Sequence, residues 1–201
     1  MQTFSISLLA SGIGKLIQRS KRDERGIAAI EFAMIVPIMV ALFIGSVELS
    51  QAITVDRRVT QIASSTADLV AREKAVTTAQ LDQIMTIATI LMKPYDTSKL
   101  KITLVSVGAK ATDNTITKVC WSYNFHGGTH TYANGTVYAL PTKDIIDKGG
   151  SVVVAEVEYD YTPLIFSHYM PGLTKLFDKF YLKPRVSSMI QYNGAAICTV
   201  T

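Results

Sequence analysis

The sequence predicts an α+β protein in which an N-terminal transmembrane helix extends into an amphipathic stalk helix, packed on a small antiparallel sheet. Three observations support this fold class. Residues 27–47 form an apolar run with a single charge, and residues 59–70 and 81–91 each repeat apolar side chains every three or four positions. From residue 100 onward, β-branched and aromatic residues alternate with polar ones. Helices followed by strands indicate an α+β arrangement.

Charge is concentrated before the apolar run. The chain has 201 residues and a formal net charge of +4. Five cations precede Gly26 against two acidic residues, which is 5 − 2 = +3 and leaves 4 − 3 = +1 for the rest. These seven residues are Lys15, Arg19, Lys21, Arg22 and Arg25, with Asp23 and Glu24. A nucleic-acid-binding domain would carry a basic stripe on its folded part, so no nucleic-acid partner is expected.

The apolar run is long enough to cross a membrane. Its 21 residues contain one charge, Glu31. At 1.5 Å per residue they span about 31 Å, close to the roughly 30 Å hydrocarbon core of a bilayer. The alternative is a buried core helix, but no soluble domain of this size needs a helix that is apolar on every side. We therefore expect a leader at 1–26, a transmembrane helix at 27–49 and an outer domain at 50–201.

Flanking charge predicts the orientation of this helix. Four cations lie within eight residues before the run, whereas Arg57 and Arg58 follow ten residues after it. This asymmetry places the N-terminus in the cytoplasm and residues 50–201 outside. An ordinary signal peptide is the competing interpretation, but it has a shorter apolar stretch that begins closer to the N-terminus.

The start of the apolar run resembles the cleavage region of type IV prepilins. It reads Arg25-Gly26-Ile27-Ala28-Ala29-Ile30-Glu31-Phe32. Type IV prepilins carry a basic leader, a glycine at the cut, four mostly apolar residues, a glutamate and a long apolar helix. Gly26 matches the residue before the cut and Glu31 the fifth residue of the mature chain. Glycine gives a peptidase a flexible, unhindered backbone at that point.

The longer stretch RGIAAIEFAMIVPIMVALFIGSVELSQAI resembles the TadE-like family in particular. Glu48 occupies the place where the family's apolar run ends in a glutamate. Residues 157–164 resemble, more weakly, its late strand and Pro-Leu turn. The resemblance implies a minor pilin or pseudopilin of a Tad/Flp tight-adherence pilus, in the bacterial inner membrane with its 50–201 domain in the periplasm. It also implies cleavage by a prepilin peptidase between Gly26 and Ile27, and contact with other pilin subunits and the assembly machinery.

Two residues within the run carry further expectations. A charge at the centre of a membrane helix costs roughly 2.5–3.5 kcal/mol, and less near its edge. The resemblance implies that Glu31 of one subunit meets the new amine at Ile27 of a neighbour, which sets the register between subunits. Alternatively, Glu31 lies at the interface and favours the positive end of its own helix. Pro37 removes a backbone hydrogen bond and should bend the helix.

The outer domain begins with two amphipathic helices. The first stripe comprises Val59, Ile62, Ala63, Thr66, Leu69 and Val70. A break is predicted at 74–78, and Thr77 to Gln80 fits a capping box. The second stripe comprises Leu81, Ile84, Met85, Ala88 and Leu91, and Pro94 ends it.

Strands are predicted at 100–107, 117–125, 151–161 and 186–192, with a glycine-rich loop at 126–135. In the third strand Val153, Ala155 and Val157 face one way, so Glu156, Glu158 and Asp160 are expected on a solvated face. A Ca²⁺ site on these carboxylates is the less favoured alternative. A short helix is expected within 163–180, with Leu173, Leu176, Phe177 and Phe180 on its apolar side.

The two cysteines, Cys120 and Cys198, are expected to pair. Pairing is permitted outside the cytoplasm. The bridge would close a loop of about 78 residues, worth roughly 4–4.5 kcal/mol in the chain-entropy model. Two free buried thiols remain the alternative.

No catalytic constellation stands out, so the chain is not expected to be an enzyme or to use a cofactor, metal or small-molecule substrate. His126 and His130 flank a glycine loop without an acidic or cysteine partner nearby in sequence. His168 is expected at a turn or on the surface. The alternative to a pilin is an uncleaved, membrane-tethered adhesin or binding domain that faces the periplasm.

Overall fold

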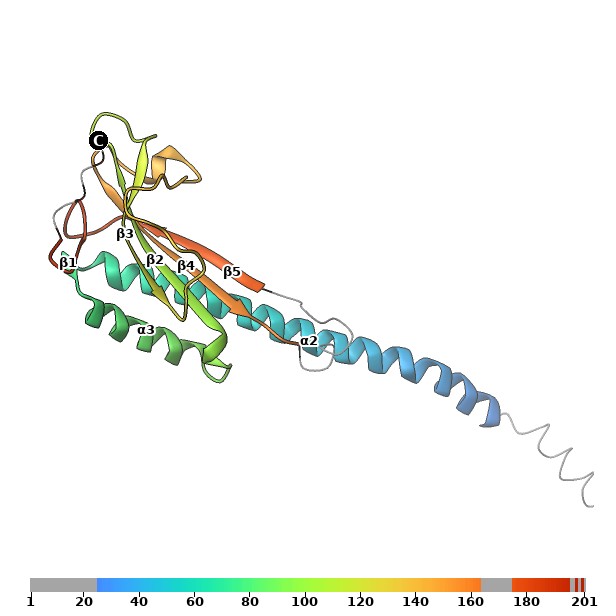
Figure 1. Cartoon of the computed structure of the whole chain (residues 1–201). Helices are drawn as coiled ribbons and strands as arrows, with labels where there is room; N and C mark the ends of the chain where they lie inside the picture. The colour runs from blue at the N-terminus through green and yellow to red at the C-terminus, as the bar shows by residue number, and fades with distance from the viewer. Residues whose placement is uncertain (1–24, 164–174, 196–197, 199, 201) are drawn as a thin grey trace, which may run out of the picture. The chain divides into compact units, whose positions relative to one another are not determined.

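A computed structural model describes residues 25–163, 175–195, 198 and 200 of the chain (Figure 1). The chain divides into two compact units, Met1–Leu49 and Ser50–Thr201. Helix α2, Arg25–Ala71, contributes to both units and continues through Pro37. The expected continuation of the apolar helix into the outer domain is therefore confirmed.

Within the second unit, α2 and α3 provide the helical part of the core. The α2 residues that repeat every three or four positions, among them Val55, Val59, Ile62 and Val70, are fully buried. Helix α3, Thr78–Met92, follows the two-residue strand β1, Ala75–Val76. Its N-terminus carries the predicted capping box. The Gln80 backbone N–H donates to Thr77 Oγ1, and the Thr77 backbone N–H donates to Gln80 Oε1.

Four strands form one antiparallel sheet: β2 (Leu100–Ala109), β3 (Thr117–Phe125), β4 (Ser151–Asp160) and β5 (Lys175–Leu182). Their order across the sheet is β3-β2-β4-β5. The strand β6, Gln191–Tyr192, pairs in parallel with β1. Two short 3₁₀ turns, Thr97–Lys99 and Lys143–Ile145, lie in the connections. The predicted α+β class is confirmed.

The sheet buries residues on both faces. On one face, alternating residues such as Leu104, Ala155 and Val157 pack in the main core with residues of α2 and α3. Figure 1 shows α3 and the later part of α2 beside the sheet. On the other face, Val105, Val107, Val152 and Val154 pack under the connection between β3 and β4, which contributes Tyr138 and Ile146. The domain is thus a three-layer packing of helices, sheet and an ordered connecting segment.

Two predictions about the C-terminal part are wrong. Residues 175–182 form an edge strand instead of part of a short helix, since Leu176, Phe180 and Leu182 alternate onto the core while the backbone pairs with β4. Leu173 lies outside the described residues. The last strand is much shorter than expected, because residues 185–189 form bends and only Gln191–Tyr192 are paired.

The solvated face predicted for β4 is also wrong in part. Glu156 is completely buried, as are Val152 and Val154 on the same face. Only Glu158 and Asp160, nearer the end of the strand, are partly exposed. The connection between β3 and β4 covers the first half of this face, which local alternation in β4 does not reveal.

Candidate functional site

The residues of the predicted cleavage motif lie on the first turns of α2. Gly26 is the second residue of the helix, and Ile27 is 60% exposed. Glu31 lies four positions after Ile27, so both occupy the same helix face, and its side chain is exposed. A Cβ added at Gly26 would meet nothing within 4 Å among the described residues. Packing against that part of the chain therefore does not require glycine at position 26.

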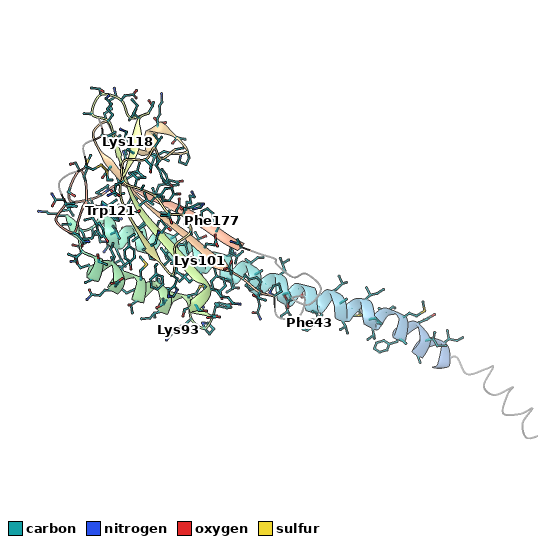
Figure 2. The ribbon with its side chains drawn as sticks, in the orientation of Figure 1. Phe43, Lys93, Lys101, Lys118, Trp121 and Phe177 are labelled. Atoms are coloured by element: carbon teal, nitrogen blue, oxygen red, sulfur yellow. A yellow bond between two sulfur atoms is a disulfide. The ribbon has the colours of Figure 1, made fainter. Side chains whose placement is uncertain are left out.

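The apolar part of α2 is exposed on all sides. Twelve large apolar side chains between Ile27 and Leu49 are 40% to 71% exposed, among them Phe43, which stands out from the helix in Figure 2. The most apolar stretch of this helix contains no residue that the described part of the protein buries. Exposing this much apolar surface to water is strongly unfavourable. This single N-terminal apolar helix thus has the length and composition of a membrane anchor.

The predicted pairing of the two cysteines is confirmed. Cys120 on β3 and Cys198 form a disulfide whose Cα atoms are 5.4 Å apart. Gly108 on the neighbouring strand makes room for it, because a Cβ at that position would lie 2.8 Å from Cys120 Sγ. The bridge fixes the chain near its C-terminus to the sheet.

A second polar site, which sequence reasoning missed, is centred on Glu156. Its carboxylate is 0% exposed and accepts five hydrogen bonds. Tyr132 Oη and Tyr138 Oη each donate to Oε1 at 2.9 Å, and Lys179 Nζ donates at 2.7 Å. Thr129 Oγ1 donates to Oε2 at 2.9 Å, and His130 Nδ1 lies at the same distance from Oε2. The donors come from the β3–β4 connection and from β5.

The neighbouring Thr103 on β2 fixes the same connection. It is fully buried and lies directly across from Glu156 in the sheet. Its Oγ1 accepts from the Thr129 backbone N–H at 2.8 Å and contacts the backbone of His130 as well. A Cβ at Gly128, whose φ is +68°, would lie 2.5 Å from this oxygen. The approach of the backbone to Thr103 therefore requires glycine at position 128.

The electrostatics of this cluster favour the ionised carboxylate. Burial alone would raise the pKa of Glu156, but hydrogen bonds from Lys179, Tyr138, Thr129 and Tyr132 outweigh burial and lower the pKa to about 2. Burial and the adjacent carboxylate raise the pKa of Tyr138 and of Tyr132. These four hydrogen bonds stabilise a carboxylate that stays charged, which suits a structural link better than proton transfer.

The remaining candidate residues take part in structural contacts. His126 Nδ1 lies 3.1 Å from the Leu100 carbonyl, and His130 joins the Glu156 cluster. Glu158 and Asp160 form ion pairs with Lys101, and Glu158 also pairs with Lys175. No group of three or more potential metal-ligating His, Cys, Asp or Glu side chains occurs among the described residues. His168 lies outside them.

Comparison with known proteins identifies the N-terminal segment. Residues 26–68 match the family model described as TadE-like protein, and this match lies wholly within α2. It covers 43 of 201 residues, about a fifth of the chain. No curated protein and no solved structure matches the chain. The chain thus carries a TadE-like segment on its apolar helix, and the family predicted from the motif at Gly26 to Glu31 is the family found.

Proposed function

We propose that this protein is a minor pilin or pseudopilin that takes part in the assembly of a Tad/Flp-type adhesive pilus. It is inserted in the bacterial inner membrane with the N-terminus in the cytoplasm and residues 50–201 in the periplasm. Its role is structural and not enzymatic. The observation that carries the proposal is the TadE-like match on a helix that is apolar and unpacked from Ile27 to Leu49.

The position of Glu31 supports an assembly role. It is the one ionisable residue within the 27–47 run, and its side chain is exposed on α2. A charge at this depth carries a free-energy cost that a partner of opposite charge reduces. Cleavage after Gly26 creates such a partner, the amine of Ile27, on every processed subunit. Subunits packed side by side can then pair Glu31 with a neighbour's amine.

The alternative function is an uncleaved, membrane-tethered adhesin or binding domain. It is favoured by one observation: the family match ends at residue 68, so the disulfide-linked sheet lies outside the matched segment. The two functions differ in where the protein is found. A pilus subunit should be recovered in sheared surface filaments or with the assembly machinery, whereas a tethered adhesin remains full-length in the membrane.

Gly26→Val should block processing by a prepilin peptidase. In cells with an active peptidase, wild-type protein should lose about 2.8 kDa, which is 26 residues at the average residue mass of this 22.0 kDa chain. The variant should keep its full mass, because the β-branched side chain hinders the backbone at the cut. Intact-mass analysis of membrane-purified protein provides the measurement.

Gly45→Val is the matched control for this experiment. Gly45 lies on the same helix, and a Cβ there would also meet nothing within 4 Å among the described residues. This variant should be processed like the wild type. An unprocessed wild-type chain, or equal processing of all three proteins, would contradict the pilin function.

Glu31→Gln should leave membrane insertion and processing intact but abolish most association with partner subunits. Glutamine keeps the shape of the side chain but removes the charge that attracts the neighbouring amine. Chemical cross-linking in whole cells, followed by counting of cross-linked species, measures association. Glu48→Gln, near the other end of the apolar run, removes a carboxylate of the same helix and should change the cross-linked fraction far less.

A further inference from the structure

A groove between α2 and α3 has the chemistry of an anion site with an apolar border. Its volume is about 460 Å³, and it is open to solvent. It is lined by Thr54, Arg57, Arg58 and Gln61 of α2, and by Ile90 and Leu91 of α3. The α2 residues follow a spacing of three and four, so one helix face presents all four. The whole groove lies within the unit Ser50–Thr201.

One of the two arginines is held in a fixed position. Arg58 Nη1 donates to the carbonyls of Leu91 and Lys93, at 2.8 and 2.7 Å. Its guanidinium also lies over the Tyr95 ring, 5.4 Å from the ring centroid. These contacts use the two hydrogens of Nη1, and Nε and Nη2 carry three more donors. A guanidinium that is already ordered loses little entropy when it binds an anion.

The second arginine and its neighbours complete a cationic surface. Arg57, one position before Arg58 on α2, is exposed. Lys93 is exposed directly after α3, where Figure 2 labels it. On α3, no acidic residue occurs between Asp82 and the end of the helix at Met92. Asp56 is one position from Arg57, about 100° away around the helix, and Asp96 caps the following turn through Ser98. The groove therefore favours an anion.

Exposed apolar side chains border the same cations. Ile53 precedes Arg57 by four residues on the same helix face and is 46% exposed. Ile90 and Ile87 on α3 are 58% and 45% exposed. Apolar side chains beside guanidinium groups match a ligand with an anionic head and a hydrocarbon chain, whereas a free anion would gain nothing from the isoleucines.

Sequence distance places the groove near the membrane surface. Arg57 follows Leu49, the last residue of the expected span, by eight residues within α2. Eight residues of helix advance about 12 Å, and the headgroup region extends roughly 5–8 Å beyond the hydrocarbon core. An arginine side chain can reach back over the remaining distance, as long basic side chains do at membrane interfaces.

We propose that the α2–α3 groove binds the phosphate of an anionic phospholipid, with Arg57 and Arg58 as ligands and Ile53 and Ile90 against the lipid chain. The site would anchor the base of the 50–201 domain on the membrane surface. This inference rests on the membrane anchoring proposed above. It does not depend on cleavage, on a pilus, or on which way the helix crosses.

A local fluorescence probe can test this binding on the full-length chain in vesicles. Ile90→Trp places an indole at the groove. The native tryptophan, Trp121, is buried, and its background signal is measured on the protein without the Ile90→Trp substitution. Phosphatidylglycerol or phosphatidylcholine with brominated chains quenches the indole on contact. Phosphatidylglycerol should quench preferentially. Adding Arg57→Gln should lower that preference about fivefold, the contribution of one basic residue near an anionic surface.

Two variants and one competitor control this experiment. Lys74→Gln removes the same charge from an exposed residue beyond the end of α2 and should leave the preference unchanged. Arg57→Lys keeps the charge without the guanidinium fork and should retain part of the preference. Arg58→Gln is less suitable, because it also disrupts the contacts that hold α3. Millimolar inorganic phosphate should not displace the lipid, since it lacks the hydrocarbon chain.

The possible outcomes distinguish a failure of the proposed lipid site from a failure of the proposed membrane anchor. Vesicle flotation is measured on the same samples, and failure to float would overturn the anchor and the lipid site together. A protein that floats but shows equal quenching by both lipids, no quenching, or an unchanged preference with Arg57→Gln would overturn the lipid site alone. Loss of the preference in inorganic phosphate would identify a simple anion site instead.

Discussion

Replacing Glu156 with alanine should lower the free energy of unfolding by about 3–5 kcal/mol, the range found when one partner of a buried ion pair is removed. The reason is the number of donors that lose their acceptor. Tyr138 is buried and both Tyr132 and Thr129 are partly buried, so their hydroxyl groups would remain poorly solvated. Lys179 contributes less to the cost, because its side chain is 31% exposed and can turn toward water.

Thermal unfolding of the full-length chain in detergent measures this effect. Trp121 is a suitable reporter, since its indole is buried and donates to the Ile190 carbonyl in the core. Glu158→Ala is the matched control, two residues along the same strand face, because Glu158 is partly exposed and its lysine partners Lys101 and Lys175 are 31% and 68% exposed. Because both lysines can turn toward water, this variant should cost about 1 kcal/mol, well below the loss expected for Glu156→Ala. Similar losses for both variants would contradict the structural role assigned to Glu156.

The pH dependence of the free energy of unfolding provides a second test of the Glu156→Ala variant. The pKa of Glu156 falls from 4.5 to about 2 on folding, so its charged form is stabilised in the native state. Its contribution to stability is therefore complete above about pH 4.5 and is lost as the pH falls toward 2. The shift corresponds to about 3 kcal/mol at 1.36 kcal/mol per pKa unit. Glu156→Ala should lack this part of the acid destabilisation.

Loss of the disulfide should cost a similar amount. Cys198→Ser opens a link between residues 78 positions apart, which the chain-entropy relation values at about 4.5 kcal/mol. The segment near Cys198 would no longer be fixed to the sheet beside Gly108. The midpoint of denaturant unfolding, followed through Trp121, should therefore lie at a higher denaturant concentration in the oxidised wild type than in the variant.

Cys120→Ser and the double variant are the controls for this prediction. Because all three substitutions remove the same bond, their effects should be equal and not additive. Thiol labelling of the denatured, unreduced wild type should find no free thiol. Two labelled thiols in the wild type, or an unchanged midpoint in Cys198→Ser, would contradict the link.

Local sequence patterns were sufficient for the helical half of the fold. The spacing of Val59, Ile62 and Val70 predicts the buried face of α2, and Thr77 with Gln80 predicts the start of α3. Capping and amphipathic periodicity depend on residues a few positions apart, so a single sequence contains the whole signal. The pairing of the two cysteines could be predicted from the expected location of residues 50–201 outside the cytoplasm. It also followed from their number, because two cysteines permit one intramolecular bridge.

The Glu156 cluster could not be predicted in this way. Its donors come from residues 18 to 27 positions before it and 23 positions after it. Alternation in β4 shows which residues share a face but not what covers that face. The apolar and aromatic residues of the connection between β3 and β4, among them Tyr132, Tyr138 and Ile146, were the available signal that it packs on the sheet. The strand at 175–182 was missed because Leu173, Leu176 and Phe180 also fit a helical spacing, and pairing with β4 decided between the two.

The most direct test of the proposed function is the identity of the first residue of the mature wild-type chain. The protein should be isolated from membranes of cells with and without an active prepilin peptidase, and its N-terminus sequenced. A pilin-type subunit should begin at Ile27 when the peptidase is active and retain residues 1–26 when it is not. A chain that retains the leader in both cases would contradict the account, and the apolar helix would then be a permanent tether.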